Sequence, residues 1–135
     1  MTIQLAKLDE DFWELLSAEE RAKASKSFEI PSFEERESLV VGRAAQLLFN
    51  IEYDDKGFVR NQIERMWVIV AERSPPFYVG RLISQPSCVV PEDEFYLSFN
   101  SEVPFQSIHV IDIQEPPAEF LAIVFGSEPT NVWPR

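Results

Sequence analysis

One cysteine and one histidine are the only side chains in this chain from which a nucleophilic catalytic pair could be built. Cys88 and His109 would need to lie within hydrogen-bond reach of each other, with a third group to orient the imidazole. The residues around Cys88 do not indicate an activated nucleophile, and the chain has no Gly-x-Ser-x-Gly motif. We therefore expect a small buried thiol and a structural histidine, and we predict no catalytic residues.

Metal and cofactor sites have equally little support in the sequence. Zinc prefers Cys and His ligands at close spacing, and this chain has one of each, far apart. Asp54-Asp55 and Glu92-Asp93-Glu94 could bind a hard cation weakly, but neither cluster follows the spacing of a calcium-binding loop. The four glycines form no phosphate-binding pattern. We predict no metal and no cofactor.

Charge carries the main functional information in the sequence. The chain has 23 Asp and Glu against 12 Lys and Arg, a formal net charge of −11, and Leu82–Pro134 contains no Lys or Arg. Such a protein repels phosphate backbones and anionic lipid surfaces, and it attracts basic proteins. We expect a basic protein partner, no nucleic acid and no membrane. The alternative interpretation is that the charge only maintains solubility.

Acidic clusters beside predicted strands are the candidate partner-binding residues. We expect them on the rim of the sheet, where an anionic surface would steer a basic partner toward the domain. An aromatic anchor would then supply much of the binding energy. The candidate acids are Asp54, Asp55, Glu92, Asp93, Glu94 and Glu102. The candidate anchors, for which a core position is the competing interpretation, are Tyr53, Phe77, Tyr78 and Tyr96.

Length and composition predict one cytoplasmic domain. The chain has 135 residues, of which 45% are hydrophobic, so it can bury a substantial core. A lone cysteine excludes an intrachain disulfide and suits a reducing compartment. The first residues lack the pattern of a signal peptide, and no apolar run reaches the length of a membrane span. We divide the domain into a helical part (1–41), a β-rich part (42–115) and a C-terminal element with a tail (116–135).

The N-terminal part is predicted to be helical. Asp9–Phe28 begins with acids that favour a helix N-terminus and continues with an apolar patch. Ser17 is followed three residues later by Glu20, which matches a capping box, so a second helix or a kink is expected there. The pair Ser32 and Glu35 gives another capping box and predicts a further short helix.

Strand patterns dominate the rest of the chain. Gln62–Glu72 is apolar on both faces, which favours a central strand, and Gly80 predicts a bulge or bend in the strand that follows. Ala118–Phe125 fits a short helix, but its apolar end also suits a strand. The predicted strands are Ala45–Tyr53, Gln62–Glu72, Phe77–Ile83, Glu94–Phe99 and Ile108–Ile113.

These elements together predict an α+β fold. We expect N-terminal helices packed on a curved, mainly antiparallel sheet of about five strands. The regular spacing of the turns also allows this sheet to form a small, partly open barrel.

Several short segments follow one another along the chain: Ile30-Pro31-Ser32, Gly42 ahead of Ala45-Gln46-Leu47-Leu48-Phe49, Glu64-Arg65-Met66-Trp67-Val68, Gly80-Arg81-Leu82 with Pro86 after it, and His109-Val110-Ile111-Asp112. In this order they resemble a group of small bacterial domains of unknown function, some of which look like immunity proteins encoded beside polymorphic toxins. The resemblance spans roughly Ile30–Ile113, and Arg43 departs from the group's pattern, which has an acid after the early glycine. It implies a bacterial origin and protein binding, and it carries over no catalytic residue.

Overall fold

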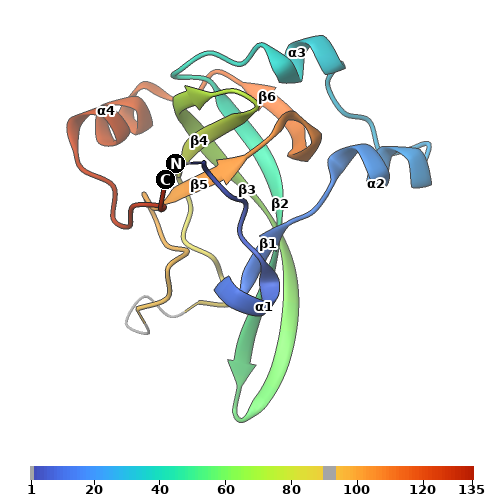
Figure 1. The fold of residues 1–135 in the computed structure, drawn as a ribbon, viewed down its shortest axis with the longest axis vertical. Coiled ribbons are helices and arrows are strands. Elements are labelled where there is room, and N and C mark those ends of the chain that lie inside the picture. The colour runs from blue at the N-terminus through green and yellow to red at the C-terminus, as the bar shows by residue number, and fades with distance from the viewer. Residues whose placement is uncertain (1, 90–93) are drawn as a thin grey trace.

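The computed structural model describes residues 2–89 and 94–135. Within them, six strands form one antiparallel sheet that curls into a half-barrel (Figure 1). The predicted α+β class, with a curved antiparallel sheet, is confirmed. The strands are β1 (Trp13–Leu15), β2 (Ala44–Asp55), β3 (Phe58–Ser74), β4 (Phe77–Leu82), β5 (Glu102–Phe105) and β6 (Val110–Gln114). The helices are α1 (Leu8–Asp11), α2 (Ala18–Ala24), α3 (Phe33–Glu37) and α4 (Ala118–Gly126), with a 3₁₀ turn, η2 (Ser107–His109).

The sheet is built around the long hairpin of β2 and β3. These strands pair from Ala44 with Ile69 to Asp55 with Phe58, and the far half of the hairpin projects from the body (Figure 1). The order β1-β2-β3-β4-β5 continues along the sheet, while β6 pairs with the start of β2. Because β5 and β6 are joined through η2, the chain crosses from one side of the curl to the other.

Strand β3 is central, as its two apolar faces predict. Met66, Val68 and Val70 are buried in the main core, and Ile69 is buried on the opposite face of the strand. Helix α4 contacts β3. Both faces of β3 are covered, so its sequence does not alternate between apolar and polar residues as a strand with one exposed face does.

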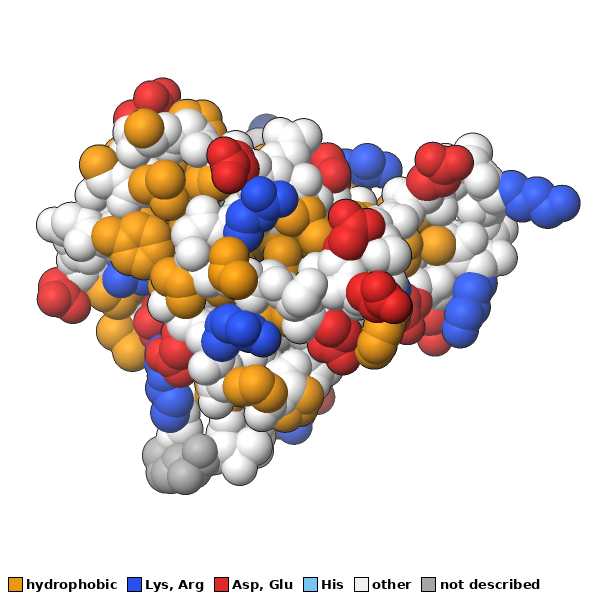
Figure 2. Space-filling view, turned by 90° about the horizontal axis from the view of Figure 1, so that it is seen from above, with side chains coloured by type: hydrophobic (Ala, Val, Ile, Leu, Met, Phe, Trp, Pro, Cys, Tyr) orange, Lys and Arg blue, Asp and Glu red, His pale blue; other side chains and the backbone are white. Residues whose placement is uncertain are grey.

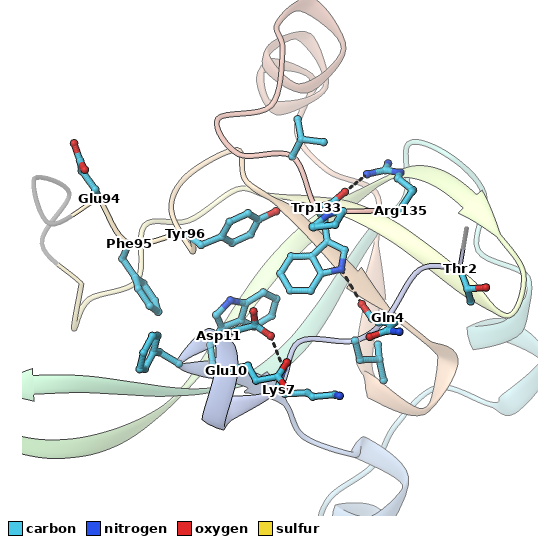
Figure 3. Close-up of a pocket in the computed structure, with 15 residues that line it drawn as sticks. Thr2, Gln4, Lys7, Glu10, Asp11, Glu94, Phe95, Tyr96, Trp133 and Arg135 are labelled. Atoms are coloured by element: carbon cyan, nitrogen blue, oxygen red, sulfur yellow. Dashed lines mark hydrogen bonds between the residues drawn. The ribbon is translucent and has the colours of Figure 1, made fainter.

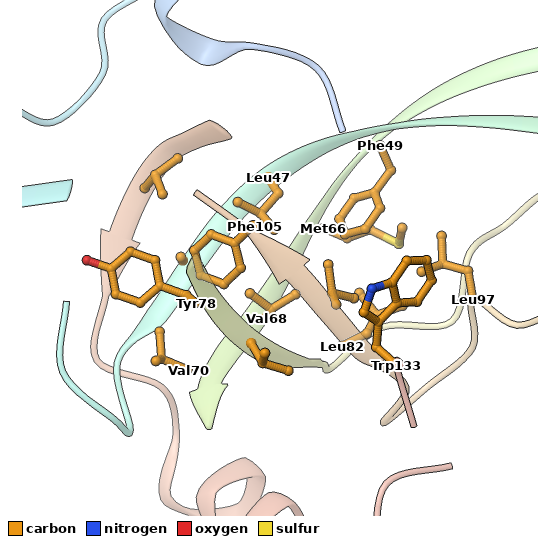
Figure 4. Close-up of a cluster of buried hydrophobic side chains, with 14 of the residues drawn as sticks. Leu47, Phe49, Met66, Val68, Val70, Tyr78, Leu82, Leu97, Phe105 and Trp133 are labelled. Carbon is orange, nitrogen blue, oxygen red and sulfur yellow. The ribbon is translucent and has the colours of Figure 1, made fainter. Parts of the chain in front are cut away.

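The main core fills the inside of the curl (Figure 4). Leu47, Phe49, Leu82 and Phe105 are all fully buried there or nearly so. Gly80 lets β4 approach β3 closely, because a Cβ at this position would lie 2.7 Å from Cγ2 of Val68. The sequence predicts a bulge or bend in the strand that contains Gly80. A bulge is present opposite this glycine, but its extra residue lies in β3, between Val70 and Glu72, and not in β4.

Helix α4 settles the ambiguity left by Ala118–Phe125. It begins after Pro117, which cannot donate a backbone hydrogen bond and therefore fits a helix start. Val124 is buried, whereas Ile123 and Phe125 remain exposed. Figure 2 shows hydrophobic side chains gathered over the left part of the face viewed from above, the side on which α4 lies. Among the described residues, no helix combines the length and apolar character needed to cross a membrane.

The prediction of a helix over Asp9–Phe28 is wrong in its middle. Helix α1 ends after a single turn because Phe12 adopts a left-handed conformation, with φ of 66°. The chain then runs extended as β1, and Trp13 pairs with Ile51 of β2. This strand buries the Trp13 ring completely, which no local helix pattern could indicate. Helix α2 follows, with Ser17 accepting a hydrogen bond from the Glu20 amide as predicted.

The predicted strand Glu94–Phe99 is also wrong. This segment has no strand structure; the next strand is β5, Glu102–Phe105. Leu97 is fully buried, and Asn100 takes a left-handed φ of 68° that turns the chain toward β5. The predicted strand Ile108–Ile113 begins two residues later, at Val110, because Ser107–His109 form η2. The capping box of Ser32 and Glu35 is confirmed in full.

Candidate functional site

A cleft of about 1010 Å³ opens where the two ends of the chain meet. Fifteen residues line it, drawn from the N-terminal segment with α1 and the start of β1, from residues 94–96, and from the C-terminal tail (Figure 3). Volumes of this size are typical of sites that hold a substantial ligand. The cleft is therefore the strongest candidate for a functional site among the described residues.

Three aromatic rings form the floor of the cleft. Trp13 stacks on Tyr96 with ring centroids 6.3 Å apart and an interplanar angle of 9°. Trp133 meets both rings edge-on, at 5.6 Å from Trp13 and 5.3 Å from Tyr96. Offset-stacked and edge-to-face arrangements are the favourable geometries for such rings. The floor is therefore a packed cluster rather than loose side chains.

Hydrogen bonds fix two of these rings. Trp133 Nε1 donates to the Gln4 carbonyl at 2.8 Å (Figure 3). The Tyr96 hydroxyl donates to the Glu102 carbonyl, also at 2.8 Å. Burial, followed by the nearby Glu102 charge, raises the pKa of Tyr96, which keeps the hydroxyl protonated. The third ring differs: Trp13 Nε1 is buried and has no hydrogen-bond partner among the described residues. Such a group is rare in folded proteins.

Acidic groups predominate at the rim. Glu10 and Asp11 come from α1, Glu94 lies at the far side of the cleft, and Lys7 is the exposed cation among the lining residues. Asp11 also accepts the backbone N–H of Lys7 at 2.8 Å. Arg135 lines the cleft too, but its guanidinium is engaged elsewhere. The charges exposed at the rim therefore sum to a negative value.

Arg135 holds the tail against the sheet. Its guanidinium pairs with Glu102 at 2.7 Å and with Glu72 at 2.8 Å, and these bonds raise its pKa. Burial alone would raise the pKa of Glu102. The hydrogen bonds from Arg135 and from the Trp133 amide outweigh that effect and hold this pKa below its usual value.

Phe12 is the most unusual lining residue. Its side chain is 51% exposed although its backbone has the left-handed φ of 66°. The position follows the last helical residue of α1, where glycine is the usual occupant because bulky residues are strained there. The Phe12 ring therefore gains little from burial while its backbone carries a cost.

The predicted acidic surface is only partly assembled. Asp54 and Asp55 lie at the hairpin tip, where Asp54 accepts the Gly57 amide at 2.9 Å and Asp55 pairs with Arg60 at 2.8 Å. Glu94 lines the cleft. Glu102 does not join an exposed surface, because it is 8% exposed and paired with Arg135. Two further predicted residues, Glu92 and Asp93, lie outside the described residues.

Of the four candidate anchors, Tyr96 is the one that lines the cleft. Tyr78 is a core residue whose hydroxyl donates to the Arg36 carbonyl at 2.9 Å, and burial raises its pKa. Phe77 is half-buried and packs against the main core. Tyr53 is half-buried on β2 near the hairpin tip. Three of the four are therefore not part of the cleft.

Cys88 and His109 do not form a pair. The Cys88 thiol donates to Glu64 at 3.4 Å, and burial followed by that carboxylate raises its pKa to about 11. His109 is buried, its Nδ1 accepts the Gln106 amide at 3.0 Å, and burial lowers its pKa to about 4. Neither group is prepared for nucleophilic catalysis. Across the described part of the chain, no group of His, Cys, Asp and Glu is arranged to hold a metal ion.

No protein-family model matches this chain, and curated proteins and solved structures likewise give no match. The resemblance to small bacterial domains therefore stays a prediction. The cleft and the distribution of charge are the features of the molecule that bear on its function.

Proposed function

We propose that this chain is a non-enzymatic acidic domain that binds a basic protein. The observation that carries the proposal is the net charge of −11, with no Lys or Arg from Leu82 to Pro134. A partner with a basic surface would be drawn to such a domain and would meet it faster at low salt. Cys88 and His109, each bonded within its own surroundings, support a role without catalysis.

The finer proposal is that the domain is an immunity-type protein of a bacterial cytoplasm, and that its partner is a basic toxin. This form of the proposal rests on the sequence resemblance. A protein of this kind acts by covering a surface of its target, so it needs shape and charge complementarity and no catalytic group. Rapid encounter is the advantage that a strongly acidic inhibitor has over a neutral one.

Affinity purification from the native host tests the general proposal. The domain is immobilised at 50 mM NaCl beside a variant in which Glu10, Glu94, Glu119 and Glu128 are each replaced by Gln. We expect one basic protein to be retained by the wild type and to bind more weakly to the variant and at higher salt. Retention of no specific protein, or of the same set by both columns, would contradict the proposal.

Co-expression tests the finer proposal once a partner is identified. The partner is expressed alone in a heterologous bacterium, and then together with the domain. Growth arrest by the partner, relieved by the domain, is the expected result. A partner that is harmless when expressed alone would refute the toxin assignment while leaving the binding function intact.

A small-ligand-binding protein or enzyme is the alternative function, and the volume of the cleft is the observation that favours it. A thermal-shift screen against metabolites distinguishes the two. Reproducible stabilisation by one ligand class would favour the alternative, because a ligand that binds only the folded state raises its stability.

A further inference from the structure

We propose that the cleft between α1, residues 94–96 and the C-terminal tail is the anchor site for an extended peptide segment in which an apolar side chain stands beside a Lys or Arg. This inference rests on the proposed function and names the surface through which the domain would hold its basic partner. It combines the apolar exposure at the cleft, an unsatisfied buried donor and the charge of the rim.

The exposed apolar side chains point to an apolar ligand group. Phe12 is 51% exposed and Val132 is 64% exposed, and both line the cleft above the aromatic floor. Folding alone would favour Gly or Asn at the Phe12 position, because those residues tolerate the left-handed conformation. A phenylalanine there is better explained by a contact that the isolated chain does not make.

The unsatisfied donor points to a ligand with hydrogen-bond acceptors. Trp13 Nε1 is buried and bonds to none of the residues that the structure describes, and Trp13 belongs to the floor of the cleft. Buried tryptophan N–H groups ordinarily find an acceptor. A peptide offers a carbonyl oxygen at every residue. Because Trp13 is fully buried in the unbound chain, such a carbonyl would satisfy Nε1 once the rings of the floor part to admit it.

The charge of the rim selects a cationic ligand. Glu10, Asp11 and Glu94 line the cleft, and the exposed ammonium among the lining residues is that of Lys7. Arg135 contributes little positive charge, since Glu72 and Glu102 neutralise it. A Lys or Arg would meet carboxylates and could also approach the Phe12 ring in a cation–π contact. A second copy of the chain is a poor occupant, because each copy carries −11.

Tryptophan fluorescence gives a direct test. The chain has three tryptophans, two of which line the cleft, so Trp67→Phe leaves only Trp13 and Trp133 as reporters. The probe is a blocked nine-residue peptide of alternating Arg and Leu, titrated at 50 mM NaCl. Two matched peptides carry Glu in place of Arg, or Ser in place of Leu. We expect saturable binding of the first peptide, and binding at least about tenfold weaker for each of the others.

Two pairs of variants locate the binding. Phe12→Asn is compared with Phe125→Asn on α4, because these phenylalanines are 51% and 53% exposed. Asn tolerates the left-handed backbone, so Phe12→Asn should fold with unchanged or higher thermal stability and still bind at least about tenfold more weakly. Glu10→Gln is compared with Glu119→Gln, since both acids lie in the first turn of a helix. Only Glu10→Gln should weaken binding, by about threefold.

Three results would overturn the site: no saturable binding of the Arg-Leu peptide, equal affinity for the Glu-Leu peptide, or equal effects of Phe12→Asn and Phe125→Asn. The same pair of variants is titrated with any partner recovered from the host. A recovered basic partner that binds both variants equally would reject this site and leave the proposed function standing. Peptide binding at the cleft without a recoverable host protein would support the site and count against the protein-binding function.

Discussion

At the scale of single residues, His109 links folding to pH. It is 4% exposed, and burial lowers its pKa to about 4, against an ordinary value of about 6.5. Between pH 6.5 and 4 the unfolded chain therefore binds a proton that the folded chain does not. The stabilisation that comes from keeping His109 neutral is therefore complete above pH 6.5. It is lost as the pH falls toward 4, and the free energy of unfolding decreases by about 3 kcal/mol over this range.

We predict that His109→Asn makes the free energy of unfolding less dependent on pH between pH 6.5 and 4. Asn keeps a side-chain acceptor for the Gln106 amide but does not titrate. Urea unfolding at pH 7, 5.5 and 4 measures the effect, with Glu119→Gln as a surface control that should leave the slope unchanged. An identical pH slope in wild type and His109→Asn would show that burial of His109 does not govern this transition.

Gly80 is the second residue whose environment permits a quantitative prediction. A Cβ there would lie 2.7 Å and 2.8 Å from two side-chain carbon atoms of Val68, and 3.3 Å from the Phe105 ring. Packing in the core leaves no space for this atom, so Gly80→Ala should destabilise the fold by about 2 kcal/mol. Gly126→Ala is the control, because its added Cβ would meet no atom within 4 Å outside its chain neighbours and its own helix backbone. Urea denaturation that shows equal stability for the two variants would contradict the observed approach of β4 to β3.

At the scale of elements, the C-terminal tail is a structural part of the domain. Trp133 is 8% exposed, and its ring packs against Trp13 and Tyr96. Arg135 ties the same segment to β5 and β3 through Glu102 and Glu72. The tail is therefore held in place at two points, by the buried Trp133 ring and by the ion pairs of Arg135.

Arg135→Gln should therefore loosen the tail. Glu102 would stay buried without its cation, and we predict a loss of about 2 kcal/mol at pH 7, in the range of hydrogen bonds to charged groups. The wild-type pKa of Glu102 is lowered, so this stabilisation is present at neutral pH and declines as pH falls below the range of an ordinary carboxyl. The free energies of unfolding of the wild type and the variant should therefore become similar at acidic pH. Arg60→Gln, which breaks the exposed pair at the hairpin tip, is the control and should cost far less.

The sequence predicts correctly those strands in which the apolar residues directly reflect which faces of the strand are buried. In β3, Met66, Val68 and Val70 face one core and Ile69 is buried on the other face, so both faces are apolar over a long run. Residues 94–99 show the limit of this reasoning. Phe95, Leu97 and Phe99 alternate as in a strand, and Leu97 is fully buried while Phe95 packs partly buried against the core. None of the described strands, however, pairs with this segment. Pairing partners are a property of the fold and cannot be read from a single segment.

The cleft was harder to predict than the sheet. Its floor needs Trp13, Tyr96 and Trp133, which come from three distant parts of the chain. The pattern around Trp13 resembles a helix, and only the pairing of Trp13 with Ile51 places this ring in the core. Tyr96 was among the predicted aromatic anchors, whereas Phe12 was assigned to a helix. A left-handed residue that ends a short helix carries no distinctive sequence pattern when it is not glycine.

At the scale of the whole molecule, both ends of the chain complete the same structure. Trp133 Nε1 bonds to the Gln4 carbonyl, and the termini lie close together beside the half-barrel (Figure 1). The cleft therefore exists only when the entire chain has folded, since its floor includes residues near both ends. The cleft, and with it the proposed binding site, is therefore present only in the folded state.

The net charge of the whole molecule should determine how its stability responds to salt. A net charge of −11 on 135 residues opposes compaction by self-repulsion, and added salt screens it. We predict that raising NaCl from 50 to 500 mM increases the thermal midpoint of the isolated domain, while any basic partner binds more weakly over the same range.

Charge reversal at one residue of α4 and one residue just after it separates this general repulsion from specific ion binding. Each change of Glu to Lys adds two positive charges, so Glu119→Lys with Glu128→Lys takes the net charge from −11 to −7. Both positions are exposed, and the stabilisation by salt should be smaller in this variant because there is less repulsion to screen. Scanning calorimetry at both salt concentrations measures the two responses. An equal or larger salt response in the variant would mean that repulsion among the acids does not limit stability, and that the acidic surface is tolerated by the fold without cost.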